Sequence, residues 1–282
     1  MTSPWAELDR PPLRAEPLRR ALVRDGEMWT DIQVVGSTGS TNTDLAELAR
    51  SGAAEGSVLV AEEQTRGRGR LDRGWVAPPR AALMLSVLVR PAAVPPERRG
   101  WLPLLAGVAM VRALRRVAEV RAVLKWPNDI MLNGRKLAGI LAEQSAGAVV
   151  IGLGLNVHTR AEELPAPTAT SLAAESAPVT DRDPLLRAYL RAFAELYLPL
   201  RAVDGDAELS GLLAEYRELC DTIGREVRVM LPGGGELTGT AAEVDTTGRL
   251  VVRGPSGERA LSAGDVVHVR GSRDDSPRRA DT

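Results

Sequence analysis

Residues 122–144 read AVLKWPNDIMLNGRKLAGILAEQ and place charged and amide side chains inside segments that are otherwise apolar. The dipeptide Asn133-Gly134 is typical of a two-residue hairpin turn, so it predicts two paired pieces of sheet on either side. Burying an unpaired charge in such a hairpin costs free energy, and these groups therefore need partners or a ligand. The polar side chains concerned are Lys125, Asn128, Asp129, Arg135 and Lys136. The structural alternative is a lysine and an aspartate that merely pair with each other.

Further strands and helices are expected on both sides of this hairpin. Apolar runs predict strands over residues 57–63, 82–90 and 148–157. Glycines in the last of these strands suggest that another group approaches its backbone closely. A helix is expected to begin at Thr41 or Asn42 and to end at Gly52. The other expected helices are residues 17–25, 101–117, 184–203 and 207–220.

The sequence changes character after Gly224, where short alternating strands are separated by the turn segments PGGG, DTTG, PSG and SAGD. This pattern predicts a small five-stranded barrel. The final polar segment is expected to be disordered. The predicted division is a lead-in at residues 1–33, a main domain at 34–222, the barrel at 223–271 and a tail at 272–282.

Composition excludes several classes of protein. The 282-residue chain has 44% apolar residues and a net charge of −1, which argues against a general nucleic-acid or anionic-membrane surface. One cysteine and two histidines leave neither a disulfide framework nor a zinc-type cluster, so the cytosol fits best. No apolar run reaches the roughly 18 residues that span a bilayer, and the N-terminus lacks an export signal.

Residues 65–75, TRGRGRLDRGW, place four arginines and three glycines between two predicted strands. Glycines free the backbone, and arginines of this kind bind anions. The segment lacks the third glycine of a dinucleotide-binding fingerprint, and no GxxxxGK[ST] phosphate loop occurs in the chain. If the chain binds a nucleotide, it must therefore hold the phosphates with a structural element other than these two motifs. A solvated loop with chance enrichment in arginine is the alternative.

Three further stretches are weak signals when each is taken alone. Ser40, Thr41 and Asn42 stand at a predicted helix start, where capping accounts for one of them. Gln64 would be a surface residue and Asn156 a turn residue.

Together these stretches resemble, in order and spacing, the signature of the biotin protein ligases. The resemblance extends from about Val34 to Arg270 and is closest to the short bacterial type, in particular to actinobacterial members. A DNA-binding domain would have to precede Ser40, and residues 1–33 offer only one helical segment where a helix-turn-helix needs at least two. The matching stretches are Ser40-Thr41-Asn42, Gln64 with GRGR at 67–70, KWPND at 125–129, GRKLAGIL at 134–141 and GLGLN at 152–156.

The resemblance implies an α+β fold, in which a mixed β-sheet catalytic domain of the class II synthetase and biotin-lipoyl ligase type carries helices on one face. A small SH3-like β-barrel would follow it. The family joins biotin to ATP with Mg²⁺, forms biotinyl-5′-AMP, and passes biotin to one lysine of a biotin carboxyl carrier domain. A cytoplasmic monomer or weak homodimer that binds neither DNA nor membrane is expected.

The resemblance also implies roles for individual residues. Lys136, Arg70 and Asp129 would be the catalytic residues, and Asp129 would lie near Mg²⁺ and the incoming lysine. The biotin contacts would be Ser40, Thr41, Asn42, Gln64, Arg68, Gly69, Arg70 and Lys136. The ATP or adenylate contacts would be Arg68, Arg70, Trp75, Lys125, Asn128, Lys136 and Asn156.

The chemistry explains these residue types. A biotin carboxylate must approach a polyphosphate, so fixed cations have to offset the repulsion between them, and a glycine-hinged arginine loop would act as a lid that shields the adenylate from water. Departures from the family pattern at Arg66 and at Leu71-Asp72 concern how that loop closes. The alternatives are a lipoate or octanoate ligase or transferase of the same fold, or a biotin-binding protein without catalysis.

Overall fold

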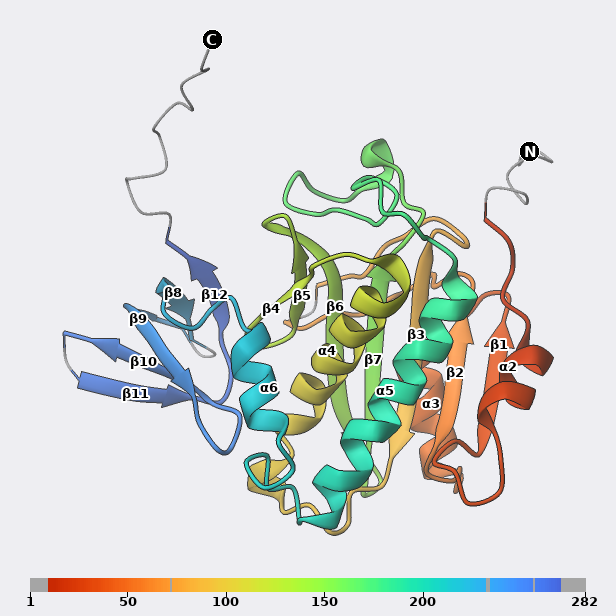
Figure 1. Ribbon diagram of the computed structural model, residues 1–282, viewed down its shortest axis with the longest axis horizontal. Coiled ribbons are helices and arrows are strands. Elements are labelled where there is room, and N and C mark those ends of the chain that lie inside the picture. The colour runs from red at the N-terminus through yellow and green to blue at the C-terminus, as the bar shows by residue number, and fades with distance from the viewer. Residues whose placement is uncertain (1–9, 72, 232–233, 256, 270–282) are drawn as a thin grey trace.

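The computed structural model describes residues 10–71, 73–231, 234–255 and 257–269. The sequence-based expectations for residues 1–9, for Asp72 and for the tail at 272–282 lie outside these ranges. A seven-stranded sheet forms the centre of the main domain, and a second sheet of five strands lies beside it (Figure 1). The predicted α+β class is therefore confirmed.

The central sheet is mixed. Its strand order is β1-β2-β3-β7-β6-β5-β4, in which β1 and β2 are parallel and the other neighbours are antiparallel. Each predicted strand is present, although most are a residue or two shorter than expected. The strands are β1 Asp31–Val35, β2 Ser57–Ala61, β3 Ala82–Val89, β4 Val123–Lys125, β5 Asp129–Leu132, β6 Arg135–Ser145 and β7 Ala148–Asn156.

Helices α2, α4 and α5 cover one face of this sheet (Figure 1). Helix α4 is buried on almost all sides because it contacts the sheet, α5 and α6 (Leu212–Leu219), and its predicted apolar positions Leu105, Val108 and Leu114 are inaccessible to solvent. These helices are α2 Ala15–Leu22, α4 Trp101–Ala113 with a π turn at Leu114–Ala118, and α5 Arg182–Ala202. Short 3-10 turns occur at Pro96–Arg98 and Ala161–Glu163.

Helix α3, Thr41–Arg50, lies on the opposite face, where the resemblance places no helix. Its Leu45 and Ala49 form a second apolar cluster with sheet residues that include Leu88 and Val150. Side chains alternate between the faces of a strand, so Gly152 and Gly154 follow Val150 on this same face. Because α3 covers only part of the face, these two glycines remain on its uncovered part.

The stretch from residue 122 to residue 144 forms three strands instead of the two expected. β4 pairs with β5, and the chain reverses at Trp126, Pro127 and Asn128, because proline has no N–H to continue a ladder. Asn133-Gly134 forms the predicted turn, with φ values of 50° and 73°. Asn128 Nδ2 donates to the carbonyl of Ile140 at 2.9 Å and ties the first turn to β6.

The segment before β1 is held by a buried ion pair. Arg182 Nη1 lies 2.6 Å from Glu62 Oε2, and Glu62 Oε1 accepts from the backbone N–H of Leu13 at 2.5 Å. Arg182 also donates to the carbonyl of Pro11 at 2.7 Å. Leu18 of α2 is fully buried against the core. Strand β1 begins at Asp31 and therefore runs across the domain boundary predicted at residue 34. That boundary stays a prediction.

The second sheet has the strand order β11-β10-β9-β8-β12, and all its pairs are antiparallel. The five predicted strands are present, and their closure into a barrel stays a prediction. The strands are β8 Glu226–Met230, β9 Glu236–Val244, β10 Leu250–Gly254, β11 Gly257–Leu261 and β12 Asp265–His268. Helix α6, Leu212–Leu219, packs on α4 and β9. It begins five residues later than the predicted Ala207, because Gly211 has a φ of 79° and residues 207–211 form turns.

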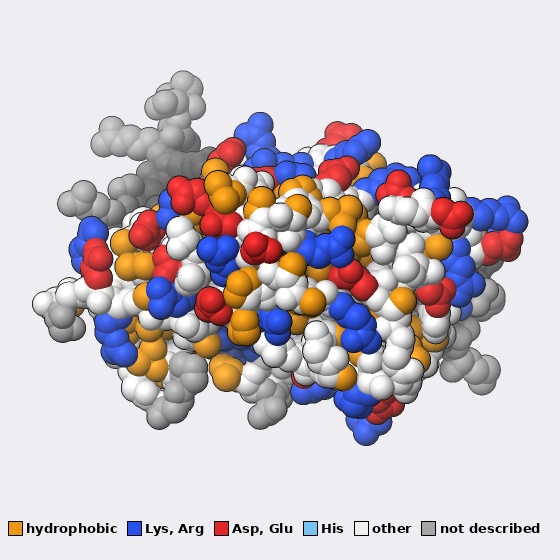
Figure 2. Space-filling model, turned by 90° about the horizontal axis from the view of Figure 1, so that it is seen from below, with side chains coloured by type: hydrophobic (Ala, Val, Ile, Leu, Met, Phe, Trp, Pro, Cys, Tyr) orange, Lys and Arg blue, Asp and Glu red, His pale blue; other side chains and the backbone are white. Residues whose placement is uncertain are grey.

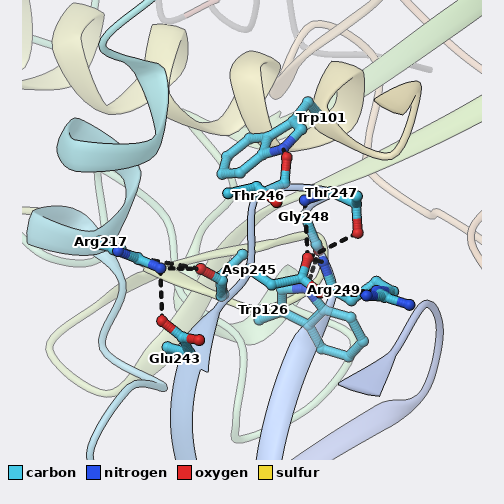
Figure 3. A network of polar contacts seen from close by, with 10 residues as sticks. Trp101, Trp126, Arg217, Glu243, Asp245, Thr246, Thr247, Gly248 and Arg249 are labelled. Carbon is cyan, nitrogen blue, oxygen red and sulfur yellow. Dashed lines mark hydrogen bonds and ion pairs between the residues drawn. The ribbon is translucent and has the colours of Figure 1, made fainter. Parts of the chain in front are cut away.

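Hydrogen bonds from two buried tryptophans join the two sheets' domains (Figure 3). The indole N–H of Trp101 donates to the carbonyl of Thr246 at 2.8 Å, and that of Trp126 donates to the carbonyl of Gly248 at 3.1 Å. Asp245 stabilises the turn that carries these carbonyls, because it accepts from the backbone N–H groups of Thr247 at 2.9 Å and Arg249 at 3.0 Å. The five-stranded domain is therefore held at a fixed place beside the hairpin of residues 122–144.

Candidate active site

A cavity of about 830 Å³, counted to its open mouth, lies on the face of the central sheet that α3 leaves partly uncovered. Such a volume is within the range of small-molecule sites. Its floor is formed by β6 and β7, one wall by the start of α3, and its cover by residues 67–75, which connect β2 to β3. The hairpin of residues 122–144 contributes a second wall.

Most of the residues predicted from the sequence line this cavity. They are Ser40, Thr41, Asn42, Gln64, Arg68, Gly69, Arg70, Trp75, Asn128, Asp129 and Lys136. Lys125 and Asn156 do not line it. Asn156 is buried at the end of β7, where its amide donates to the carbonyl of Thr170 at 3.0 Å. Roles for these two residues in ATP binding stay predictions.

Polar groups at the start of α3 are held by one another. Gln64 Oε1 accepts from the backbone N–H of Thr41 at 2.8 Å and from its hydroxyl at 3.0 Å. The hydroxyl of Ser86 on β3 donates to Asn42 Oδ1 at 2.6 Å and lies 2.8 Å from Thr41 Oγ1. Ser40 stands at the cap position, yet its side chain makes no capping hydrogen bond. Capping therefore does not account for its hydroxyl, which lines the cavity.

The loop of residues 67–75 is a small hairpin. Gly69 N–H donates to the carbonyl of Arg73 at 2.7 Å, and Trp75 N–H donates to the carbonyl of Gly67 at 2.9 Å. A Cβ at Gly67 would lie 2.2 Å from the carbonyl oxygen of Trp75, so only glycine fits this position. The loop can therefore fold tightly over the cavity.

Three arginines of the loop contact residues from three different segments of the chain. Arg68 Nη1 lies 2.9 Å from Glu143 Oε1 on β6, and Arg70 Nη1 donates to Asn128 Oδ1 at 3.0 Å. Arg73 forms an ion pair with Asp265 of β12. Burial lowers the pKa of Arg70, and the charges of Asp129 and Asp265 partly oppose that shift. An arginine keeps its proton in proteins, so Arg70 is a fixed, partly desolvated cation.

Lys136 and Asp129 form an ion pair within the hairpin, with Lys136 Nζ 2.6 Å from Asp129 Oδ1. The lysine side chain is 37% exposed and the aspartate 21% exposed. The contact has the distance of an ion pair without the angles of a hydrogen bond, and Asp129 Oδ1 is buried with no hydrogen-bond donor among the described residues. The lysine–aspartate pair expected as the structural alternative does form, but it faces the cavity.

The indole ring of Trp75 lies on two paired glycines, Gly139 of β6 and Gly154 of β7. A Cβ at Gly154 would lie 2.4 Å from the ring, and a Cβ at Gly152 would lie 2.2 Å from Asn42 Oδ1. The close approach to this strand that the sequence predicts is confirmed. The indole N–H of Trp75 is buried and has no acceptor among the described residues.

Sequence reasoning missed three charged residues around the cavity. These residues are Arg73 of the loop, Glu143 and Asp265. The alternation of β6 could have found Glu143, because it lies on the same face as Gly139 and Leu141. No local signal marks Asp265, which belongs to the other domain.

Neither a cluster of metal-ligating side chains nor a membrane-spanning helix is found among the residues that the structure describes. The described part of the chain contains no group of three or more His, Cys, Asp and Glu side chains arranged to hold a metal ion. No helix in the described ranges is both long enough and apolar enough to cross a membrane. Figure 2 shows one face of the molecule, on which basic and acidic side chains are interspersed.

The chain matches known proteins over nearly all of its length. The biotin/lipoate A/B protein ligase family matches residues 34–158, and the biotin protein ligase C-terminal domain matches residues 222–269. A biotin–(acetyl-CoA-carboxylase) ligase of Mycobacterium tuberculosis is 45% identical over 265 residues, which are 93% of this chain and 97% of that protein. A protein of the same name from Paracoccus denitrificans is 31% identical and covers 81% of this chain and 97% of its own length.

A solved structure, the biotin protein ligase from Aquifex aeolicus in complex with biotin and ATP, superposes with a TM-score of 0.73. It is 26% identical in sequence and covers 86% of this chain and all of that one. The family, fold class and enzyme class expected from the sequence are confirmed by these matches. The chain belongs to the biotin protein ligases, within the biotin/lipoate A/B protein ligase family.

Proposed function

We propose that this cavity joins biotin to ATP and that the chain then passes the biotinyl group to a lysine of a biotin carboxyl carrier domain. One observation carries the proposal: Arg70 and Lys136 line the same cavity as Ser40 and Gln64. Groups suited to anions and groups suited to a neutral polar ring therefore lie within reach of one ligand. In the first step a biotin carboxylate oxygen bonds to the α-phosphorus of ATP, and pyrophosphate leaves.

The cations of the cavity serve that first step. A carboxylate and a triphosphate repel each other, and positive charge fixed before the reaction lowers the barrier most where water is excluded. Arg70 supplies such a charge from the loop, since its hydrogen-bond partner Asn128 is neutral. Lys136 supplies another from the floor, once ligand oxygens compete with Asp129 for its ammonium group.

The wall at the start of α3 suits the ureido ring of biotin, which offers one carbonyl acceptor and two N–H donors. Ser40 and Asn42 are buried beside the apolar Leu85, so the ring would meet polar groups on an apolar surface. The Trp75 indole N–H adds a buried donor that lacks an acceptor in the described chain. We assign these residues to biotin, and Asn128 to the adenylate.

A magnesium ion fits the carboxylates present. Mg²⁺ is usually bound through one or two carboxylates together with substrate phosphates, and the Asp129 side chain lines the cavity and is 21% exposed. When bound, the ion would neutralise charge on the departing pyrophosphate. Asp129 is therefore the residue that we assign to hold it.

Transfer to the carrier requires the loop to move. The ε-amine of the acceptor lysine attacks the carbonyl carbon of biotinyl-5′-AMP, AMP leaves, and the amine loses a proton, which we assign Asp129 to accept. The loop of residues 67–75 would shield the adenylate until the carrier arrives. We also propose that the protein is cytoplasmic and acts as a monomer or weak homodimer that binds no DNA; its net charge of −1 supports the last of these points.

The experiment that tests the proposal is covalent labelling of a purified carrier domain with labelled biotin. Labelling that requires Mg²⁺ and ATP, and that stops when the acceptor lysine is replaced, is the expected result. ATP–pyrophosphate exchange that responds to lipoate and not to biotin would instead assign the cavity to lipoate activation. Biotin binding without exchange would make the protein a carrier or sensor.

A further inference from the structure

Glu143 stands at the border between the covered and the open part of the sheet face. It lies on the same face of β6 as Gly139 and Leu141, and it pairs across the sheet with Val150. Val150 is covered by α3, whereas the next residue of β7 on this face, Gly152, lines the cavity. A carboxylate at this border can reach both α3 and the loop that covers the cavity.

One oxygen of Glu143 holds the biotin-facing wall. Asn42 Nδ2 donates to Glu143 Oε2 at 2.9 Å and to the carbonyl of Leu141 at 3.1 Å. Asn42 Oδ1 accepts from the hydroxyl of Ser86 at 2.6 Å, so the amide cannot turn over without losing these bonds. Asn42 is 4% exposed, which makes an unsatisfied amide there costly.

The other oxygen of Glu143 holds the loop. Arg68 Nη1 lies 2.9 Å from Glu143 Oε1, and the Glu143 side chain is 29% exposed. Arg68 belongs to the strand-like start of the loop hairpin, opposite Gly74. The carboxylate therefore joins two segments that are distant in sequence, the start of α3 and the loop of residues 67–75.

We propose that Glu143 is a positioning residue that fixes the amide of Asn42 and the guanidinium of Arg68 in one arrangement, so that the loop closes over a preformed biotin wall. The inference deepens the proposed function, on which it rests. Because Glu143 neutralises Arg68, that arginine fastens the loop, whereas Arg70 meets the anion. The family resemblance assigns contacts with biotin and with the adenylate to both Arg68 and Arg70. The present proposal gives these two arginines different roles.

The test is Glu143→Gln in the full chain, which keeps the size of the side chain and removes its charge. Biotin affinity is measured by titration calorimetry without ATP, and the loop is probed by the rate of tryptic cleavage within residues 65–75. Charge-assisted hydrogen bonds are among the stronger ones, so the biotin Kd is expected to rise about tenfold. Cleavage is expected to become faster in the absence of biotin.

Glu47→Gln on α3 is the matched control, since it removes the same charge from an exposed side chain. It is expected to change neither readout, and both variants are expected to unfold at the wild-type temperature. Arg68→Gln adds a second measurement. If Glu143 positions Arg68, the double variant Arg68→Gln/Glu143→Gln binds biotin no more weakly than the weaker single variant.

Two results would overturn the inference. One is a Glu143→Gln protein whose biotin Kd and cleavage rate both stay within about twofold of wild type, which is below the loss of one charge-assisted bond. The other is additive losses in the double variant, which would mean that Arg68 contacts biotin on its own. If Glu143→Gln does not fold, an unchanged biotin Kd in Arg68→Gln overturns it. A wild-type protein that does not bind biotin would contradict the proposed function instead.

Discussion

Two ion pairs of equal length differ in burial in this molecule. Arg182 and Glu62 lie 2.6 Å apart, with side chains 2% and 8% exposed, and Lys136 and Asp129 also lie 2.6 Å apart, with side chains 37% and 21% exposed. The first pair makes further hydrogen bonds to the backbone of Pro11, Leu13 and Ala82. Both side chains of the second pair line a cavity.

The comparison shows that contact length alone does not separate a structural pair from a reactive one. What separates them is burial and the number of backbone groups that hold the pair, although Arg182 Nε has no hydrogen-bond partner among the described residues. A fully buried pair is costly to break, whereas a partly exposed pair contributes little to stability and can exchange partners with a ligand. The pair at Lys136 can therefore exchange partners with a ligand, as the role proposed for this lysine requires.

The largest expected effect is on stability, from Arg182→Met. Removing the cation leaves Glu62 buried without its partner, which should lower the free energy of unfolding by about 3–5 kcal/mol. Urea-induced unfolding measures the change. Arg20→Met breaks the exposed pair with Glu16 and should cost about 0.3–0.5 kcal/mol. If both variants lost the same free energy of unfolding, burial would not determine how much an ion pair contributes to stability.

The second effect is on activity, from Lys136→Ala. Loss of a fixed cation at the reacting phosphate should slow biotin-dependent ATP–pyrophosphate exchange about 10²–10³-fold. The free energy of unfolding should change by less than about 1 kcal/mol, since the pair with Asp129 is partly exposed. Arg135→Ala, which removes the neighbouring cation of the pair with Glu175, is the control for charge. A variant that exchanges normally would exclude Lys136 from adenylation.

The third effect is on retention of the adenylate, from Arg70→Ala. The variant loses the cation over the cavity and the hydrogen bond to Asn128, so biotinyl-5′-AMP should dissociate about tenfold faster while the protein stays folded. Stopped-flow displacement of the adenylate measures the rate. A dissociation rate equal to that of wild type would refute the role of the loop as a lid.

The smallest effect is expected from Asp265→Asn, which detaches Arg73 of the loop from the five-stranded domain. The hydrogen bond from Arg73 lowers the pKa of Asp265. The stabilisation is therefore complete above the ordinary carboxyl pKa of about 3.9 and is lost as the pH falls through the lowered value. Both side chains are partly exposed, so solvent limits the difference from wild type to about 1 kcal/mol or less at pH 7.

Chemical unfolding of wild type and Asp265→Asn at pH 7 and near pH 3 tests this sign. The difference between the two proteins should be present at pH 7 and become smaller as the pH falls towards 3. A difference that grows as the pH falls would mean that the carboxylate destabilises the folded protein.

Local rules in the sequence predicted those features whose causes are local. The Asn133-Gly134 turn follows from two residues that tolerate positive φ, and the buried face of α4 follows from its spacing. The break between β4 and β5 was missed, although Pro127 cannot continue a ladder. The set of residues around the cavity came from the family resemblance, because no periodicity brings Gln64 beside Thr41.

Contacts that arise only from tertiary packing could not be predicted. Asp265 reaches the loop because Trp101 and Trp126 fix the five-stranded domain beside the hairpin. Glu143 of β6 contacts both Arg68 of the loop and Asn42 of α3, because the loop and α3 pack over the same part of that strand. Neither pairing leaves a local mark in the sequence.

A crystal structure of the protein grown with biotin and ATP tests the central claim most directly. The account predicts biotinyl-5′-AMP in the cavity, with the ureido ring against Ser40 and Asn42 and the phosphate between Lys136 and Arg70. Adenylate bound elsewhere, or bound here with Lys136 still paired to Asp129 and turned away from the phosphate, would contradict it.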